Sequence, residues 1–174
     1  MKKEPVLDFY LKMSAVQQYR HTLISLQNLI TTCITDKEIV VTHGYYSKDI
    51  PNSLTNNINN YRIGEKITHW SFLSTSFDPS ISLSFSGKCC LLVIKIPKGT
   101  PVLMIQSTKE DNFLQGEGVR NMGQAEIVLP AGLVYQVTGI EKNRLFLFST
   151  SLGYKVKEIN IVELEVVGSS RILI

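Results

Sequence analysis

The sequence predicts an α+β protein whose strands form mainly antiparallel or mixed sheets. Apolar residues recur at three- and four-residue steps in the first forty residues, as in amphipathic helices. From residue 38 onward, many short strand-like segments follow with few helical segments between them, which argues against a doubly wound parallel sheet. The chain has 174 residues, of which 44% are hydrophobic. It is therefore long enough to bury one substantial core, and we expect a single domain over residues 1–174.

The helical part contains two groups of regularly spaced apolar residues, which predict two helices with a break near residues 13–15. The residues of these stripes are Leu7, Tyr10, Leu11, Leu23, Leu26, Leu29 and Ile30. The β-branched run "EIVVTHG" then predicts a strand that ends at Gly44. The Asn-, Ser- and Pro-rich residues 47–67 predict mostly loop with one short helical turn.

Alternating apolar and polar residues in "THWSFLSTSF" predict one half-buried strand over residues 68–77. The next segment, "DPSISLSFSG", predicts a short helix with Asp78 as its N-cap and Pro79 in the first helical position. The segment "KCCLLVIKIPKG" predicts a central strand closed by a Pro-Lys-Gly turn, and "TPVLMIQS" predicts the next strand.

A polar, glycine-rich segment over residues 108–124 predicts a long loop. Loops beyond about 12–15 residues in a compact domain are uncommon and often functional. Four more strands are expected after it, in "AEIVLP", "LVYQVTGI", "RLFLFS" and "INIVELEVV".

Composition excludes several classes of protein. The formal net charge is +3 and the basic residues are scattered, so no nucleic-acid footprint is evident. No apolar run approaches the roughly 20 residues needed to cross a bilayer, and Glu4, Pro5 and Asp8 interrupt any signal-peptide core. The three cysteines are odd in number and no histidine lies at metal-ligand spacing from them. We therefore expect a soluble cytoplasmic protein with reduced thiols and no metal.

Four features could carry chemistry. One is the loop of residues 109–123, in which the lone aromatic Phe113 is either a recognition tip or, as is commoner, a side chain folded back onto the core. The other three are groups of residues on predicted strands. His43 and Gly44 end a predicted strand, Ser74, Thr75 and Ser76 place hydroxyls on both faces of another, and Gln124 and Glu126 lie on one face at the start of a third. Each group also has a purely structural interpretation. A lone His is usually a surface or satisfied core residue, a strand hydroxyl often bonds the neighbouring backbone, and an acid before an apolar triplet often begins a solvated strand.

In this order, the groups resemble the ADP-ribosyltransferases of the arginine–serine–glutamate branch, which includes cholera-toxin-like toxins and vertebrate ecto-transferases. Family members have a strand ending in Arg-Gly, an FxSTS strand, a paired LLxIxIPKGTxxLxI segment, and ExEVLLPxGxxYxV or its QxE variant. The corresponding segments here are "VVTHG", "FLSTSF", "LLVIKIPKGTPVLMI" and "QAEIVLPAGLVYQVTGI". The resemblance covers residues 20–140. It implies an ADP-ribosyltransferase-like split β-sandwich of two mainly antiparallel sheets with N-terminal helices, and NAD bound between the sheets.

The resemblance also implies roles for the catalytic residues. Glu126 would bond the nicotinamide ribose of NAD and stabilise the oxocarbenium-like state formed as nicotinamide leaves, because a fixed anion beside developing positive charge lowers the barrier. Ser74 would orient Glu126. Family members with Gln in the first motif position tend to modify side chains other than arginine, so Gln124 implies a non-arginine acceptor.

Further roles follow for NAD binding and acceptor recognition. The backbone of Gly44 would lie near the nicotinamide carboxamide, and Thr75 and Ser76 would support the strand and the ligand amide. Phe85 would stack on nicotinamide or ribose, with a place in the core as an equal alternative. The loop 109–124 would recognise the acceptor, with Phe113 near its first turn.

One position departs from the family pattern. The strand-end arginine that contacts the phosphates and ribose of NAD is replaced by His43, which lacks the permanent charge and bidentate fork of arginine. A His at this position is similar to the diphtheria-toxin-like and poly-ADP-ribose polymerase branch, where it bonds the adenine-side ribose. Lys88 could compensate with a phosphate contact, although a solvated turn lysine is its plainer interpretation.

The leading hypothesis is an intracellular, monomeric mono-ADP-ribosyltransferase, a glycosyltransferase in the nucleotidyltransferase group, that uses NAD to modify a protein acceptor. The alternative is a catalytically inactive binding module that kept the fold, lost the arginine, and acts through the 109–124 loop. An RNA 2′-phosphotransferase of related fold is a third hypothesis, against which the missing basic binding residues argue.

Overall fold

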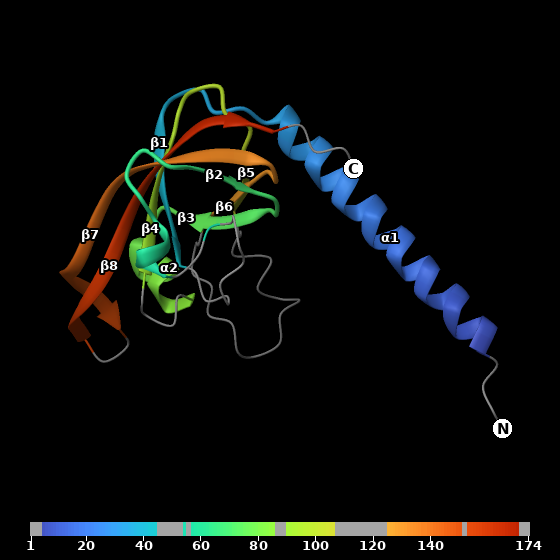
Figure 1. Ribbon diagram of the computed structural model, residues 1–174, viewed down its shortest axis with the longest axis horizontal. Coiled ribbons are helices and arrows are strands. Elements are labelled where there is room, and N and C mark those ends of the chain that lie inside the picture. The colour runs from blue at the N-terminus through green and yellow to red at the C-terminus, as the bar shows by residue number, and fades with distance from the viewer. Residues whose placement is uncertain are drawn as a thin grey trace.

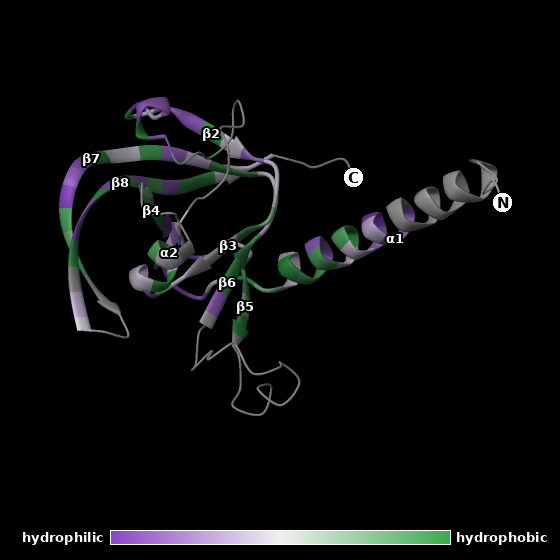
Figure 2. Cartoon of the chain, turned by 90° about the horizontal axis from the view of Figure 1, so that it is seen from below, coloured by the Kyte–Doolittle hydropathy of each residue, from purple (hydrophilic) through white to green (hydrophobic). Residues whose placement is uncertain are grey.

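The computed structural model describes residues 5–44, 54, 57–85, 90–106, 125–150 and 153–170. One long helix precedes a curved sheet and projects away from it in both views of the chain (Figures 1 and 2). The elements in chain order are α1 (Pro5–Thr32), β1 (Ile39–Gly44), the 3₁₀ turn η1 (Ile58–Asn60), β2 (Lys66–His69), β3 (Leu73–Ser76), α2 (Pro79–Phe85), β4 (Cys90–Ile96), β5 (Leu103–Gln106), β6 (Ala125–Leu129), β7 (Leu133–Thr150) and β8 (Gly153–Ser169).

The α+β class is confirmed, and the described strands form one eight-stranded sheet in the order β2-β7-β8-β4-β1-β3-β6-β5. The strand ladder joins its two parts through a single residue pair, Thr42↔Ser76 of β1 and β3. On one side of this pair lie five strands, and on the other lie β3, β6 and β5. The expected pair of sheets therefore corresponds to two parts of a continuous sheet. All neighbouring strands described are antiparallel except β4 and β8, which are parallel.

The two parts also meet at a corner where two connections run together. β2 pairs with β7, and β3 pairs with β6. The turn between β2 and β3 therefore runs alongside the turn between β6 and β7. At this corner the amide of Gly132, whose φ is 83°, donates to the carbonyl of His69 over 2.7 Å. Positive φ favours glycine here. The predicted single strand over residues 68–77 is therefore wrong, because its two halves pair with different partners.

β7 and β8 form one long hairpin, so the strands predicted at 133–140 and 144–149 belong to a single strand. The β7–β8 pairing has register shifts between residues 134/135, 137/139 and 141/144 of β7, and irregularities of this kind bend a strand. Gly139 lies at the second shift, where a Cβ would collide with the carboxylate of Glu163. Beyond the third shift, residues 144–150 and 153–159 pair with each other and with no other described strand, and we call this two-stranded segment the distal ribbon. It extends past the rest of the sheet (Figure 1).

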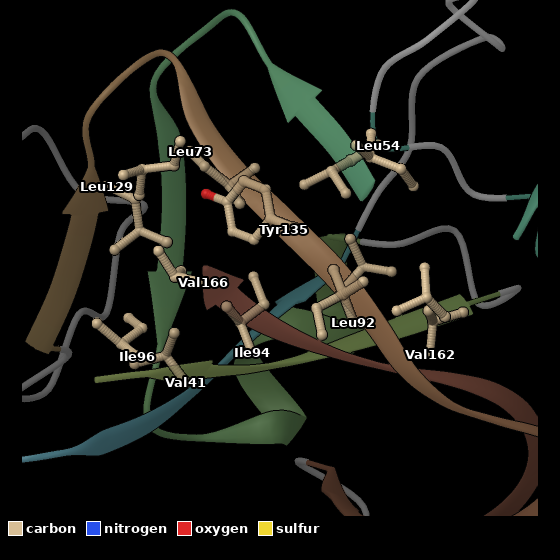
Figure 3. Close-up of a cluster of buried hydrophobic side chains, with 14 of the residues drawn as sticks. Val41, Leu54, Leu73, Leu92, Ile94, Ile96, Leu129, Tyr135, Val162 and Val166 are labelled. Atoms are coloured by element: carbon tan, nitrogen blue, oxygen red, sulfur yellow. The ribbon is translucent and has the colours of Figure 1, made fainter. Parts of the chain in front are cut away.

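The main core lies between the two parts of the sheet, as the close-up in Figure 3 shows. Leu73 and Leu129 face it from the smaller part, and Ile94, Tyr135 and Val166 face it from the larger part. A second, smaller cluster covers the other face of β4 and β8 and includes Leu83, Leu91, Ile159 and Ile161, with Phe146 of the distal ribbon packed against it. The side chains of the two clusters contribute most to the stability of the fold, because each fully buried aliphatic side chain contributes about 1.5–3 kcal/mol.

The helices partly match the sequence-based expectations. α2 begins at Pro79, and the Asp78 carboxylate accepts from the amide of Ser80 over 2.8 Å, as expected for an N-cap. The predicted turn within residues 47–67 is η1. The predicted break near residues 13–15 is wrong, since α1 runs through it without interruption. The residues there are Met, Ser and Ala, and neither proline nor glycine interrupts the backbone hydrogen bonds.

Candidate active site

Glu126 and Ser74 meet across the β3–β6 pair. The register places Ser76 opposite Glu126 and Ser74 opposite Val128, so Ser74 and Glu126 are diagonal neighbours on one face. The Ser74 hydroxyl donates to Oε1 of Glu126 over 2.5 Å. This is the short distance typical of a hydroxyl bonded to a carboxylate. The half-buried carboxylate is thus held in one orientation by a neighbouring strand.

An apolar residue flanks the same carboxylate on its other side. Ile105 of the edge strand β5 lies directly opposite Glu126 and is 45% exposed. Since opposite residues in an antiparallel pair share a face, Glu126 sits between the hydroxyl of Ser74 and the side chain of Ile105. Sequence analysis missed Ile105, although its place in "TPVLMIQS" and the strand pairing together would identify it.

The other two hydroxyls of the triplet bond to the protein itself. The buried Thr75 hydroxyl donates to the carbonyl of Ile127 over 2.7 Å and so joins β3 to β6 on the core face. The hydroxyl oxygen of Ser76 accepts from the amide of Asp78 over 3.0 Å, at the turn into α2. Both residues fix the strand that carries Ser74, and a contact of either with the ligand amide stays a prediction.

A buried hydroxyl pair secures α2 against β1, which sequence analysis also missed. The Thr42 hydroxyl donates to the carbonyl of Ser76 over 3.0 Å. The Ser82 hydroxyl donates to the carbonyl of Thr42 over 2.9 Å and lies 2.8 Å from the Thr42 hydroxyl. These bonds tie α2, β1 and β3 together at the one residue pair that joins the two parts of the sheet.

His43 follows that pair directly and lies half-buried at the end of β1. Its Nδ1 is 2.6 Å from the carbonyl oxygen of Ser74. Burial lowers the pKa of His43 below its ordinary value, and the hydrogen bond to the Ser74 carbonyl opposes part of this effect. The ring therefore carries no charge at neutral pH.

A second buried histidine lies near His43. His69, at the end of β2, is 3% exposed and its Nε2 shares a hydrogen bond of 2.9 Å with the hydroxyl of Ser71. Burial, and secondarily the repulsion from a charged His43, lowers the pKa of His69 to about 4. Its two-residue spacing from the buried Ile67 in "KITH" is the sequence signal that could have placed it on the core face.

The remaining site residues of the sequence analysis are placed only in part. Gly44 is buried and pairs with Leu91 of β4, beside His43. Phe85 is the last residue of α2, and its side chain lies outside the described residues. Lys88, Gln124 and the loop 109–124 with Phe113 also lie outside them.

No three His, Cys, Asp or Glu side chains among the described residues gather in a way that could hold a metal ion. The helices described include none that is both long enough and apolar enough to cross a bilayer.

Solved structures with the same fold are ADP-ribosyltransferase toxins. C3larvin from Paenibacillus larvae aligns with a TM-score of 0.55 and 17% identity over 87% of this chain and 72% of its own. C3stau2 from S. aureus, solved with NAD, aligns with a TM-score of 0.56 and 16% identity over 88% of this chain and 73% of its own. The enzymatic component C2-I of the Clostridium botulinum C2 toxin aligns with a TM-score of 0.55 and 14% identity. That alignment covers 93% of this chain but only 40% of C2-I. At these identities the likeness shows the fold.

No curated protein matches the chain. A family model does match it, however, over residues 13–170, which include every described strand and the Ser74–Glu126 pair. That model describes the ADP-ribosyltransferase exoenzymes. The chain therefore belongs to the ADP-ribosyltransferase exoenzyme family, whose members transfer ADP-ribose from NAD.

Proposed function

We propose that the protein is a mono-ADP-ribosyltransferase that moves ADP-ribose from NAD to a protein side chain other than arginine. The hydrogen bond between Ser74 and Glu126 is the observation that carries this proposal. It supports a fixed carboxylate at the position where the family stabilises developing positive charge. The three cysteines, odd in number, fit action in a reducing cytoplasm.

In the proposed reaction, the bond between C1′ of the ribose and the nicotinamide nitrogen breaks, and its electron pair leaves with neutral nicotinamide. Positive charge develops over C1′ and the ring oxygen of the ribose. The anion of Glu126 stabilises this charge, and because Ser74 already holds the carboxylate, little reorganisation is needed during the reaction. A nucleophile of the acceptor then bonds to C1′ and loses its proton.

The other residues take supporting roles in this proposal. Gly44, Ser76 and Phe85 line the nicotinamide side, Thr75 supports the strand that carries Ser74, and the loop 109–124 with Phe113 selects the acceptor. Gln124 in the first motif position supports an acceptor other than arginine. Agmatine, a small guanidine, tests this: we expect no ADP-ribosyl-agmatine from the protein and labelled NAD, and its formation would refute the non-arginine assignment.

The central test is nicotinamide release from NAD. We expect Glu126→Gln to lower the rate at least about 100-fold, because it removes the anion and keeps the shape of the side chain. Glu158→Gln is the matched control, since Glu158 is exposed on the distal ribbon. Both variants should melt at the wild-type temperature. A wild-type rate in Glu126→Gln would refute the role of Glu126.

A second candidate function is favoured by His43. Its uncharged ring replaces the arginine that contacts NAD phosphates in the family, as expected of a binding module that has lost catalysis. NAD raises the melting temperature of a protein whose native state binds it. No nicotinamide release and no thermal shift at millimolar NAD would favour the binding module over the enzyme.

A further inference from the structure

The ladder between β1 and β3 stops where the site begins. These strands pair at Thr42↔Ser76, and two residues further along the same register Gly44 would lie opposite Ser74. That pair is not part of the ladder. The carbonyl of Ser74 instead has the ring of His43 as a partner, at 2.6 Å from Nδ1. A side chain thus continues the connection between the strands after backbone pairing has ended.

The chemistry of this contact fixes the proton on the ring. A carbonyl oxygen only accepts hydrogen bonds, so Nδ1 of His43 must be the donor. Because burial lowers the pKa of His43, the ring is neutral at pH 7 and its single proton is on Nδ1. Nε2 then carries a lone pair. A neutral ring in this tautomer offers neither a charge nor an Nε2–H donor to a phosphate, unlike the arginine fork.

Ser74 connects this contact to the carboxylate. Its backbone carbonyl accepts from His43, while its hydroxyl donates to Glu126 over 2.5 Å. The backbone of Ser74 pairs with Val128 of β6 on one side. On the side of β1, Ser74 lies beyond the end of the ladder, where His43 supplies the contact to its carbonyl.

From these contacts we propose that His43 is a positioning residue, which holds the Ser74 carbonyl with Nδ1–H and through Ser74 sets the orientation of Glu126. The inference rests on the proposed transferase function, and it replaces a phosphate-binding role for this position. NAD phosphates must then be bound by other groups.

Three substitutions distinguish positioning of Ser74 by His43 from binding of the NAD phosphates by His43. The amide nitrogen of Asn occupies the place of Nδ1, whereas that of Gln occupies the place of Nε2. We expect His43→Ala to lower kcat for nicotinamide release by about 10- to 100-fold through misplacement of Glu126, with KM for NAD changed less than about threefold. His43→Asn should restore most of kcat, and His43→Gln should behave like His43→Ala.

The opposite pattern would overturn the proposal. If His43→Ala raised KM for NAD tenfold or more at unchanged kcat, His43 would bind NAD in the ground state instead. Rescue by Gln and not by Asn would place the important contact at Nε2. Melting temperatures of the three variants show whether each is folded at the assay temperature.

A spectroscopic measurement keeps the test independent of turnover. In ¹⁵N spectra of the wild-type protein at pH 7, His43 should show the neutral tautomer protonated on Nδ1. The ¹³C carboxyl resonance of Glu126 should move in His43→Ala toward its position in Ser74→Ala, and should stay near the wild-type position in His43→Asn. A protonated ring, an Nε2–H tautomer, or a Glu126 resonance unaffected by His43→Ala would refute the positioning role. If the spectra agree and no variant or wild-type protein releases nicotinamide, the transferase function fails and the positioning contact stands.

Discussion

β3 and the distal ribbon are both short stretches of strand, but their side chains have opposite environments. In β3, polar Thr75 and Ser76 are 4% and 7% exposed. In the distal ribbon, the apolar side chains of Leu145, Leu147 and Tyr154 are 67%, 61% and 77% exposed. The two polar side chains of β3 are thus buried, whereas the three apolar side chains of the distal ribbon face solvent.

The difference comes from the number of neighbours each strand has. β3 lies between β1 and β6, and α2 packs on β1 beside it, so its hydroxyls must find partners inside the protein. Among the described strands, no third one pairs with the distal ribbon, and the face that carries Phe146 packs on the smaller core cluster. Position in the sheet, and not hydropathy, decides burial in these two segments.

The largest expected effect that separates the two regions is on catalysis. Ser74→Ala should lower nicotinamide release about 100-fold, because Glu126 loses the donor that holds it. Its free energy of unfolding should change by less than about 0.5 kcal/mol, since Ser74 is exposed. Parallel turnover and urea-denaturation measurements check both. If Ser74→Ala lost as much stability as a core substitution, the Ser74 hydroxyl would stabilise the fold, contrary to the prediction.

Acid should lower the free energy of unfolding, because His43 and His69 are at least partly buried in the folded protein. His69 has a pKa of about 4 in the folded protein, below its ordinary 6.5. Between these values the unfolded chain binds a proton that the folded chain does not, so stability is present above pH 6.5 and is lost as the pH falls toward 4. We expect a loss of roughly 2–3 kcal/mol from His69, and His43 acts in the same direction.

Urea denaturation at pH 4, 5, 6 and 7 measures this loss. His69→Gln should flatten the dependence on pH, whereas His21→Gln, on the exposed surface of α1, should not. Equal slopes for the two variants would contradict the assignment to His69.

Thr75→Val should cost about 1–2 kcal/mol of stability, because it removes a buried hydrogen bond between β3 and β6 and keeps the shape of the side chain. The measurement is the free energy of unfolding in urea, with Thr138→Val on an exposed position of β7 as control. A loss no greater than that of the control would show that the Ile127 carbonyl finds another partner.

The smallest effect is expected on the open face of the distal ribbon. Leu147→Thr should change the free energy of unfolding by less than about 0.5 kcal/mol, since the side chain is mostly exposed. Phe146→Thr, on the other face of the same strand, should cost clearly more because it contacts the smaller core cluster. Similar losses for both would mean that the exposed face is covered in solution.

Local signals in the sequence predicted the elements that depend on local chemistry. Asp78 and Pro79 mark the start of α2 because capping involves only neighbouring residues. The strand division at Trp70 was missed, because it depends on whether residues 69 and 73 pair with β7 or β6. The family motifs pointed to Ser74 and Glu126. The contact of His43 with the Ser74 carbonyl could not be predicted, because it depends on where a ladder between two distant strands ends.

The position of β8 has a consequence for the time course of folding. It is the last described strand in chain order, yet it lies in the middle of the larger part of the sheet, between β7 and β4. Its parallel pairing with β4 joins Leu91 to Ile161, a contact between distant parts of the chain that forms slowly. During synthesis, β1 and β4 leave the ribosome with one edge unpaired until β8 arrives, and such edges favour aggregation. The candidate site should therefore mature only after β8 has emerged, and the yield of folded protein should depend on protecting β4 until then.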